Sequence, residues 1–179
     1  MLEQEYQKMF EEEEKNWYFK GKRSVVFDYL ERTGKKDLKI LDVGCGTGIN
    51  LQKLGAFGQA FGIDVSRNAL NFCQQRSLAN LGQASIENLP FKNNSFDLVT
   101  CLDVLYHKGV KSNEQALKEI DRVSKTGAML VLTESAFKSL WSEHDQAVQA
   151  KTRYTIQDFK ELLAKTSFKI TKSSYWNFF

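Results

Sequence analysis

The pattern of apolar and polar positions predicts helices and strands that alternate along most of the chain. Short apolar runs of strand type are separated by segments whose apolar residues recur every three or four positions. The expected strands are 38–43 (LKILDV), 59–65 (QAFGIDV), 83–86 (QASI), 96–102 (FDLVTCL), 127–135 (GAMLVLTES) and 168–176 (FKITKSSYW). The expected helices between them cover 48–54, 66–76, with Ser66 as N-cap, 112–125 and 155–166.

The N-terminal part, residues 1–34, is expected to be helical. Apolar residues recur there at near-helical spacing, with acidic residues on the opposite face, and a second helix over SVVFDYLERT ends at Gly34. Strands spaced by helices require crossover connections, which produce a parallel sheet covered on both faces. The pattern therefore predicts an α/β fold: a three-layer α/β/α, doubly wound, mostly parallel sheet of Rossmann-like type with an N-terminal helical extension.

Composition indicates which partners and which cellular compartment to expect for the protein. The chain of 179 residues carries a net charge of +3 without a lysine or arginine block, so no nucleic-acid partner is expected. Three widely spaced cysteines fit a reduced, cytoplasmic protein better than a disulfide framework, and no metal-ligand spacing occurs. No signal peptide or transmembrane segment is expected, because no apolar run approaches the roughly 20 residues of a membrane span.

A glycine-rich turn, ILDVGCGTGIN at 40–50, follows the first strand, where a sheet of this kind binds ligands. Its spacing is shorter than the G-x-G-x-x-G of dinucleotide sites, and Asp42 precedes it by two residues. A carboxylate there suits a cation better than a pyrophosphate. Asp64 ends the second strand and suits ribose hydroxyls, although NAD enzymes place an acid similarly. Together these features favour S-adenosylmethionine (SAM), which carries a sulfonium and an ammonium group.

Four motifs in order resemble the class I SAM-dependent methyltransferases, specifically the type 11 group: ILDVGCGTG, GIDVS, IENLPFKNNSFDLVTCLDVLYH and EIDRVSKTGAMLVLTES. The resemblance implies a seven-stranded sheet whose last strand is antiparallel. Because the sequence stops after the sixth expected strand, we expect the seventh to be missing. Trp176, Phe178 and Phe179 would then form an exposed apolar end, with a homo-oligomer contact possible at this edge.

The resemblance also implies a single methyltransferase domain over 1–179, with N-terminal helices at 1–34, a cofactor-binding core at 38–134, and a substrate-side insertion and C-terminal strand at 135–179. In relatives an acid stands at the position of Ser85, so the contact to the adenine amino group is expected to be weaker or to move to Glu87. Arg23 is expected to bind the methionine carboxylate. The implied cofactor-binding residues are Asp42, Gly44, Cys45, Gly46, Gly48, Asp64, Val65, Ile86, Glu87, Leu102 and Arg23.

Two further segments resemble one subgroup of that family, NWYFKGKR at 16–23 and LWSEHDQAVQAKTRYT at 140–155. Thr152 stands where that subgroup usually has an arginine. His144 and Asp145 form either a substrate-side pair or the cap of a short helix. The expected substrate-side residues are Trp17, Trp141, His144, Asp145, Arg153 and Tyr154.

Methyl transfer from a sulfonium mainly requires alignment of the acceptor and exclusion of water, so a dedicated base is optional. His107 is the candidate base, or a residue that orients a loop or lines the pocket, and Tyr106 is a second, weaker catalytic candidate. The predicted function is transfer of a methyl group from SAM, leaving S-adenosylhomocysteine, to a small-molecule or lipid- or sugar-linked acceptor. The alternatives are a SAM-binding protein without transfer activity and an NAD-dependent oxidoreductase.

Overall fold

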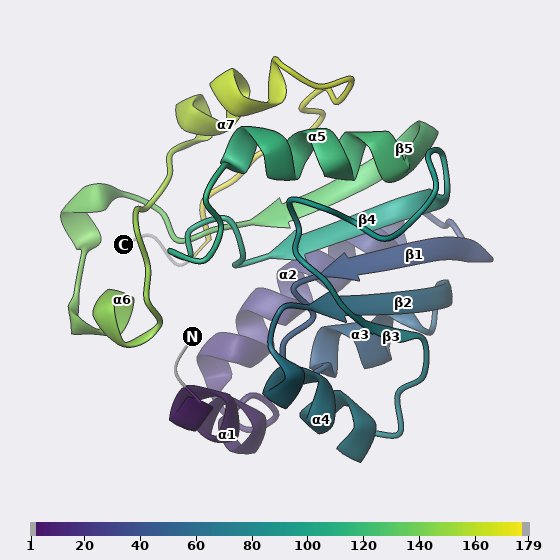
Figure 1. Ribbon diagram of the computed structural model, residues 1–179. Helices are drawn as coiled ribbons and strands as arrows, with labels where there is room; N and C mark the ends of the chain where they lie inside the picture. Colours follow the sequence, from purple (N-terminus) through teal and green to yellow (C-terminus); the bar gives the residue numbers. More distant parts are fainter. Residues whose placement is uncertain (1–2, 177–179) are drawn as a thin grey trace.

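The computed structural model describes residues 3–176, which form a five-stranded sheet with helices on both faces (Figure 1). The strand order is β3-β2-β1-β4-β5, and every neighbouring pair is parallel. The elements are α1 (Glu3–Glu12), α2 (Trp17–Arg32), β1 (Leu38–Val43), α3 (Ile49–Leu54), β2 (Gly58–Asp64), α4 (Arg67–Gln75), β3 (Leu81–Gln83), β4 (Phe96–Leu102), α5 (Asn113–Val123), β5 (Ser124–Thr133), the 3₁₀ turn η1 (Lys138–Leu140), α6 (Glu143–Ala147) and α7 (Ile156–Leu163).

The chain reverses its direction of travel across the sheet beside β1. It runs outward from β1 to β2 and β3, and then returns to place β4 on the other side of β1. In this register Asp42 lies opposite Gly62 of β2 and Thr100 of β4. Connections diverge at such a point, and the crevice outside the carboxyl ends of the strands is where doubly wound sheets bind ligands.

Each face of the sheet buries its own apolar cluster. On one face, Leu30 of α2 and Leu54 of α3 pack against Ile40 and Leu98, and none of these side chains is more than 1% exposed. On the other face, α5 buries Leu117 and Ile120 against β1 and β4, and α7 packs beside α5 (Figure 1). The sheet is therefore apolar on both sides, as the continuous apolar runs in the sequence predict.

Side-chain caps set where three of the helices begin. Ser66 accepts a hydrogen bond from the Ala69 N–H at the start of α4, as predicted, and Ser112 does the same for the Gln115 N–H at the start of α5. Thr155 and Asp158 form a reciprocal capping box at the start of α7. These caps satisfy donors that have no partner within the helix.

The expected sixth strand is wrong. Residues 168–176 form no strand, and those from 169 onward are exposed. The end of this segment packs on side chains of α2 and the insertion: Tyr175 lies against Phe137, and the Trp176 ring occupies the space beside Gly21, which has no Cβ. The outer edge of β5 therefore has no strand partner among residues 3–176, and these residues contain no seventh strand either. Phe178 and Phe179 lie outside the described residues.

The expected third strand is displaced toward the N-terminus. β3 covers Leu81–Gln83, so only Gln83 of the predicted 83–86 belongs to it. The ladder stops because Ser85 turns the chain: its hydroxyl accepts a hydrogen bond from the Glu87 N–H, and its carbonyl accepts one from the Asn88 N–H. The N-terminal extension contains two helices, as predicted, but the second begins at Trp17 and so starts before the predicted SVVFDYLERT segment.

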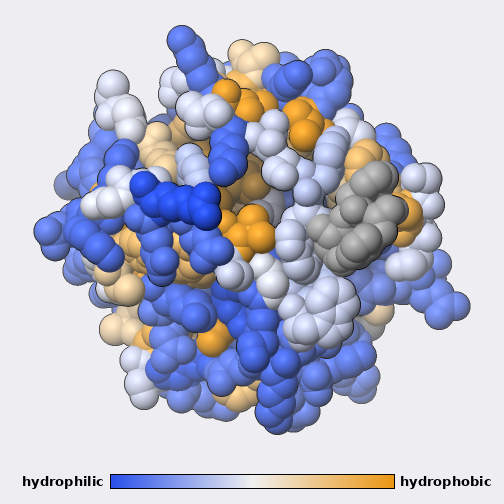
Figure 2. All heavy atoms as spheres, turned by 180° about the vertical axis from the view of Figure 1, so that it is seen from behind, coloured by the Kyte–Doolittle hydropathy of each residue, from blue (hydrophilic) through white to orange (hydrophobic). Residues whose placement is uncertain are grey.

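None of the helices described between residues 3 and 176 is long and apolar enough to cross a membrane. Seen from the side opposite to Figure 1, most of the surface is hydrophilic, and the apolar residues form small, separate groups (Figure 2).

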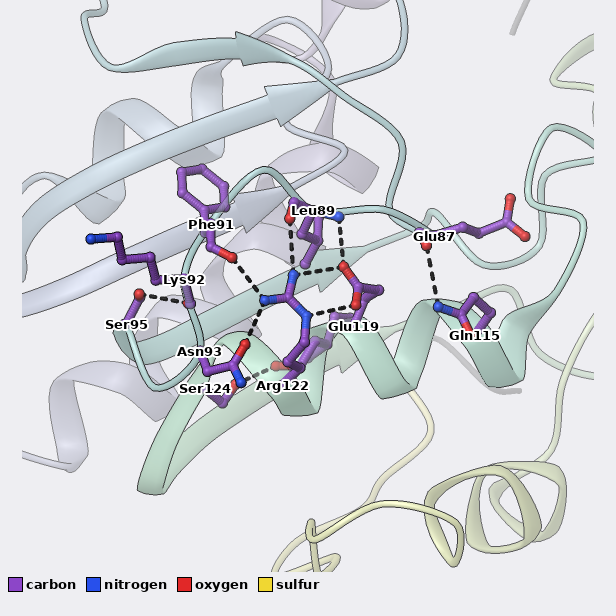
Figure 3. Close-up of polar contacts among 11 residues, drawn as sticks. Glu87, Leu89, Phe91, Lys92, Asn93, Ser95, Gln115, Glu119, Arg122 and Ser124 are labelled. Carbon is purple, nitrogen blue, oxygen red and sulfur yellow. Dashed lines mark hydrogen bonds and ion pairs between the residues drawn. The ribbon is translucent and has the colours of Figure 1, made fainter.

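Arg122 of α5 clamps the loop between β3 and β4 onto the sheet (Figure 3). Its guanidinium donates to the Leu89 carbonyl at 2.9 Å, to the Phe91 carbonyl at 2.8 Å and to the Asn93 side chain at 2.8 Å. Glu119, one turn earlier on α5, accepts from the same guanidinium and from the Leu89 N–H. The clamp fixes the segment that leads from β3 to the start of β4 against the last turn of α5.

Replacement of Arg122 by methionine should lower the free energy of unfolding by about 1–3 kcal/mol, because it removes charge-assisted hydrogen bonds and leaves Glu119 without its cation. Urea denaturation followed by circular dichroism measures this change. Lys118→Met is the matched control: Lys118 lies on the same helix in an exposed pair with Glu114, and its loss should change stability by less than about 0.5 kcal/mol. Equal effects of the two variants would contradict the clamp.

Candidate functional site

Asp42 is a buried carboxylate at the carboxyl end of β1. One oxygen, Oδ1, accepts a hydrogen bond from the Thr100 hydroxyl at 2.6 Å, while Oδ2 is buried without a hydrogen-bond partner. Burial raises the pKa of Asp42 to about 7, the Thr100 hydrogen bond opposes the shift, and the charge of Asp64 adds to it. A carboxylate in this state gains from a cationic or hydrogen-bond-donating group placed beside Oδ2.

The glycine turn after β1 has a backbone that side chains would not permit. Gly44, Gly46 and Gly48 all have positive φ, at 70°, 54° and 89°. A Cβ on Gly44 would come within 2.5 Å of Val104 Cγ2. The Gly44 and Cys45 N–H groups both donate to the Ile63 carbonyl, at 2.8 and 2.9 Å, which holds the turn against the end of β2.

Asp64, the last residue of β2, ties this turn to the next helix. Its Oδ2 accepts the Gly46 N–H at 3.0 Å and its Oδ1 accepts the Ser66 N–H at 2.9 Å. Burial raises its pKa, and these two N–H groups act in the opposite direction. Each carboxylate oxygen can accept a further hydrogen bond, so ribose hydroxyls remain possible partners.

Helix α1 covers the glycine turn, an arrangement that the sequence did not suggest. Glu13, directly after α1, is 3% exposed, and its Oε1 accepts the Thr47 hydroxyl at 2.5 Å and an Arg76 N–H at 2.8 Å. Met9 Cε lies 3.2 Å from the position that a Cβ on Gly46 would take. Tyr6 is buried near Asp64 and Ser66, and burial raises its pKa to about 12. The turn is thus enclosed from the N-terminal side.

The third-strand residues predicted to contact adenine have separate surroundings. Ile86 is 4% exposed and belongs to the core, whereas Val65 is 62% exposed at the end of β2. The Glu87 carboxylate accepts hydrogen bonds from the N–H groups of Lys111 and Ser112, so it stabilises the start of α5. A cofactor role for these residues stays a prediction.

The loop after β4 is held by a carboxylate that follows β5. Glu134 accepts the N–H groups of Val104 at 3.0 Å, Leu105 at 2.6 Å and Tyr106 at 3.2 Å. Burial and the nearby charge of Asp103 raise its pKa to about 8, although the N–H groups favour the charged form. Leu102, at the end of β4, is partly buried beside this loop.

Tyr106 and His107 stack on each other, with ring centroids 4.3 Å apart. Burial raises the pKa of Tyr106 and lowers the pKa of His107 to about 4. The imidazole is therefore neutral at physiological pH, and its buried Nδ1 has no hydrogen-bond partner. A neutral imidazole can still accept a proton, but so low a pKa makes it a weak base.

The insertion after β5 contains a buried ion pair. Asp145 is 1% exposed and accepts two hydrogen bonds from Arg153, both at 2.9 Å, together with hydrogen bonds from the Ser142 N–H and hydroxyl. It thereby completes the capping box of α6, whereas His144 beside it is exposed. The Tyr154 hydroxyl donates to the Leu105 carbonyl at 3.0 Å, which joins the insertion to the loop after β4. Substrate contacts of these residues stay predictions.

At the start of α2, the side chain of Asn16 caps the helix by accepting the Tyr18 N–H. Trp17 is 68% exposed and Trp141 of the insertion is 41% exposed, so both rings have free area for a partner. Arg23 is half-buried and donates to the Glu13 carbonyl at 2.7 Å. The predicted contact of Arg23 with a methionine carboxylate is not tested by this geometry.

Comparison with known proteins supports the same kind of site. The family described as "Methyltransferase domain" matches residues 41–132, which include the glycine turn, both aspartates and β4. The chain belongs to the class I SAM-dependent methyltransferases of type 11.

Among curated relatives, demethylmenaquinone methyltransferase of Staphylococcus aureus is 34% identical over 160 residues, an alignment that covers 80% of this chain and 63% of the relative. An uncharacterised protein of Methanocaldococcus jannaschii is 29% identical over 133 residues, with 74% of this chain and 51% of the relative covered. This methyltransferase chain therefore spans only part of the length of these relatives.

Two solved structures share the fold. A SAM-dependent methyltransferase of Aquifex aeolicus superposes with a TM-score of 0.65 at 20% identity, over 81% of this chain and 80% of the other. A SAM-dependent methyltransferase of Mesorhizobium loti gives a TM-score of 0.66 at 17% identity, over 76% of each chain. At such identities the likeness establishes the α/β architecture alone.

Several residues around this candidate site were not singled out in the sequence: Thr100, Glu13, Asp103 with its ion-pair partner Lys22, and Glu134. Thr100 carried a usable signal, since it is a polar residue in the middle of an apolar strand. Glu134 carried a similar one, because it is an acid near the end of the fifth predicted strand. Glu13 stands in the run EEEE and could not be distinguished from its exposed neighbours.

Asp42→Asn should make the protein less sensitive to pH. The pKa of Asp42 rises from its ordinary value near 3.8 to about 7 on folding, so between these values the native state holds a proton that the unfolded chain releases. Stability therefore falls as pH rises through this window, by an amount on the order of 2–4 kcal/mol. The asparagine variant lacks this loss, so its stability relative to wild type should increase from pH 5 to pH 8 in denaturant titrations.

Asp97→Asn is the control, because this carboxyl titrates below pH 5 in both the folded and the unfolded chain and its effect on stability should stay constant from pH 5 to pH 8. The Lys125 ammonium and the Lys39 N–H lower the pKa of Asp97, so its charge stabilises the native state at neutral pH. A stability difference for Asp42→Asn that stays constant between pH 5 and pH 8 would contradict the assigned shift.

Proposed function

We propose that this chain transfers a methyl group from SAM to a small-molecule acceptor. The observation that carries the proposal is the unpartnered, buried Oδ2 of Asp42 beneath a glycine turn at the switch point of the sheet. A free amine or ammonium donor is the partner that such an oxygen lacks, and SAM has one in its methionine part. The shortened glycine spacing and the match to the methyltransferase family support the same cofactor.

The fit of SAM to the residues present is good in three respects. The glycines give the turn a backbone of positive φ with no Cβ at three positions, Asp64 retains acceptor sites for ribose hydroxyls, and Asp42 offers a carboxylate to the ammonium group. Val65 and Ile86 would lie along the adenosine, Leu102 would lie near the sulfonium, and Arg23 would reach the methionine carboxylate once it leaves Glu13. When bound, SAM supplies an activated methyl group on a sulfonium.

The acceptor is proposed to bind between the start of α2 and the insertion at 135–155. Both segments present exposed aromatic side chains, and the relative from S. aureus is named for a quinone substrate. Trp17 and Trp141 would flank an acceptor ring. Asp145 and Arg153 hold the insertion in shape, and Tyr154 fixes it to the loop after β4. These residues would align the acceptor and exclude water, which is most of what methyl transfer requires.

A second candidate function is SAM binding without transfer. Thr152 stands where the resembling subgroup has an arginine, and in the structure its hydroxyl donates to the adjacent Arg153 carbonyl. If that arginine is needed to hold an acceptor, the cofactor would bind and no methyl group would move. Dinucleotide binding is disfavoured by the same features that favour SAM, the short glycine spacing and Asp42.

Isothermal titration with SAM and with S-adenosylhomocysteine tests the cofactor directly. Wild type should bind both, and Asp64→Ala should lose at least about tenfold in affinity, since removal of hydrogen bonds to a carboxylate costs roughly 1.5–3 kcal/mol. Asp97→Asn, a carboxylate change at the amino end of β4 and so at the end of the sheet away from the glycine turn, should bind like wild type. Circular dichroism verifies that each variant is folded.

Absence of binding by folded wild type would overturn the proposed function. Binding of NADH in place of SAM would favour the oxidoreductase. Binding of SAM without label transfer from methyl-labelled SAM to any of a set of phenols, amines and thiols would favour the cofactor-binding protein.

A further inference from the structure

Buried polar atoms without a partner concentrate at the ligand end of the sheet. Within residues 3–176, the buried side-chain atoms that lack a hydrogen-bond partner are Asp42 Oδ2, Asp103 Oδ1, His107 Nδ1 and Thr133 Oγ1. Asp42 is explained by the proposed cofactor. The other three belong to the ends of β4 and β5 and to the loop that follows β4. Unsatisfied buried groups in a folded protein are few, and such a concentration indicates a missing polar partner.

Asp103 is the best placed of the three. It directly follows Leu102, the residue expected near the reacting sulfonium, and it has a φ of 61°, a left-handed conformation that is costly for a residue with a Cβ. Its N–H donates to the Thr133 carbonyl at 2.8 Å, which fixes this conformation against β5. Strained backbone of this kind persists where the surrounding structure holds a side chain in one direction.

The carboxylate of Asp103 is also oriented from the side of α2. Lys22 forms an ion pair with Oδ2, so Oδ1 is the free oxygen. Burial acts to lower the pKa of Lys22, but the charge and hydrogen bond of Asp103, together with the influence of Tyr18 and Glu134, raise it overall, so the ammonium stays charged. The pair is electrically balanced without a ligand. A partner for Oδ1 therefore has to donate a hydrogen bond and does not need to bring a charge.

Glu134 does not compete for this role, because both its oxygens are used. They accept the three consecutive N–H groups of Val104, Leu105 and Tyr106, so they hold the loop that begins at Asp103. The result is a fixed carboxylate with one satisfied oxygen and one unsatisfied oxygen. Such an arrangement is pre-organised for a single hydrogen bond from a ligand.

We propose that Asp103 is an acceptor-binding residue, whose Oδ1 accepts a hydrogen bond from a neutral hydroxyl group on an aromatic acceptor. The inference rests on the proposed function, since it places the acceptor beside the methyl group. The hydroxyl supplies the donor that Oδ1 lacks, and the stacked rings of Tyr106 and His107 lie in the same loop. The acceptor class is therefore a phenol or a hydroxylated ring such as a reduced quinone.

Two ligands that differ chiefly in their ability to donate a hydrogen bond distinguish the contribution of this hydrogen bond to affinity from that of ring packing. In the presence of saturating S-adenosylhomocysteine, the affinities of 1-naphthol and 1-methoxynaphthalene are measured by titration calorimetry for wild type, Asp103→Asn and Asp97→Asn. The two rings have nearly the same shape, but only 1-naphthol can donate a hydrogen bond. Asp97 is the matched control because it belongs to the same strand, at its opposite end, and pairs with Lys125.

Wild type and Asp97→Asn should prefer 1-naphthol by about tenfold or more, the range expected for a hydrogen bond to a charged group. Asp103→Asn should reduce that preference to less than about threefold while it binds S-adenosylhomocysteine like wild type. A purely structural role of Asp103 would weaken both rings equally and leave the preference unchanged, which would overturn the proposal.

The remaining outcomes of this experiment also test the role of Asp103. Equal affinity of wild type for the two rings would mean that a water molecule satisfies Oδ1, and failure of wild type to bind either ring would exclude this acceptor class. Both results overturn the role of Asp103 and leave the proposed function standing if S-adenosylhomocysteine binds. Absence of S-adenosylhomocysteine binding by wild type would overturn the proposed function itself.

Discussion

The ligand end of this protein depends on one carboxylate, Asp64, which joins the ends of two parallel strands. It holds the glycine turn after β1 through the Gly46 N–H and the start of α4 through the Ser66 N–H. Arg76 directly follows α4 as its C-cap, and its guanidinium donates to the Thr47 carbonyl and to Glu13. The turn, the helix after β2 and the N-terminal cover are therefore parts of one hydrogen-bonded assembly.

The same assembly shows how much of the fold could be predicted from sequence. Strands such as LKILDV and FDLVTCL could be predicted because a strand buried on both faces must be apolar along most of its length. That requirement is visible in the residues of the strand itself. The segment FKITKSSYW has a similar local pattern but forms no strand, since the placement of Trp176 beside Gly21 depends on α2, far away in the sequence. Whether a segment pairs as a strand depends on contacts with residues distant in the sequence. The β-propensity of the segment alone does not contain that information.

The candidate site divides in the same way. The glycines, Asp42 and Asp64 were identifiable because a tight turn at a strand end needs those residue types at that spacing. The contacts that position the turn were not, because Glu13 and Thr47 are 34 residues apart and Lys22 and Asp103 are 81 apart. For Asp145 the sequence allowed two roles, a substrate-side residue or the cap of a short helix. The structure adds its bidentate pair with Arg153 and the capping box, both of which need coordinates.

Buried carboxylates at Asp42, Asp64 and Glu134 make the ligand end less stable than an apolar edge would be, since burial opposes the charge of each. Functional sites commonly contain groups that lower the free energy of unfolding, and packing elsewhere in the domain compensates for that loss. Here the compensation is visible in the two apolar clusters, whose central side chains are fully buried on either face of the sheet.

The way α1 is attached has a consequence for the stability of the N-terminal cover relative to the sheet. Its helix-to-helix packing is with α4, and its contact with the turn passes through Glu13, Met9 and Tyr6, so no strand pairing depends on it. Detachment of α1 would break the contacts of Glu13 with Thr47 and Arg76 but no strand pairing. We therefore expect the amides of α1 to exchange with solvent at a lower free energy than those of β1 or β4, because the sheet can stay folded when the cover over the glycine turn opens.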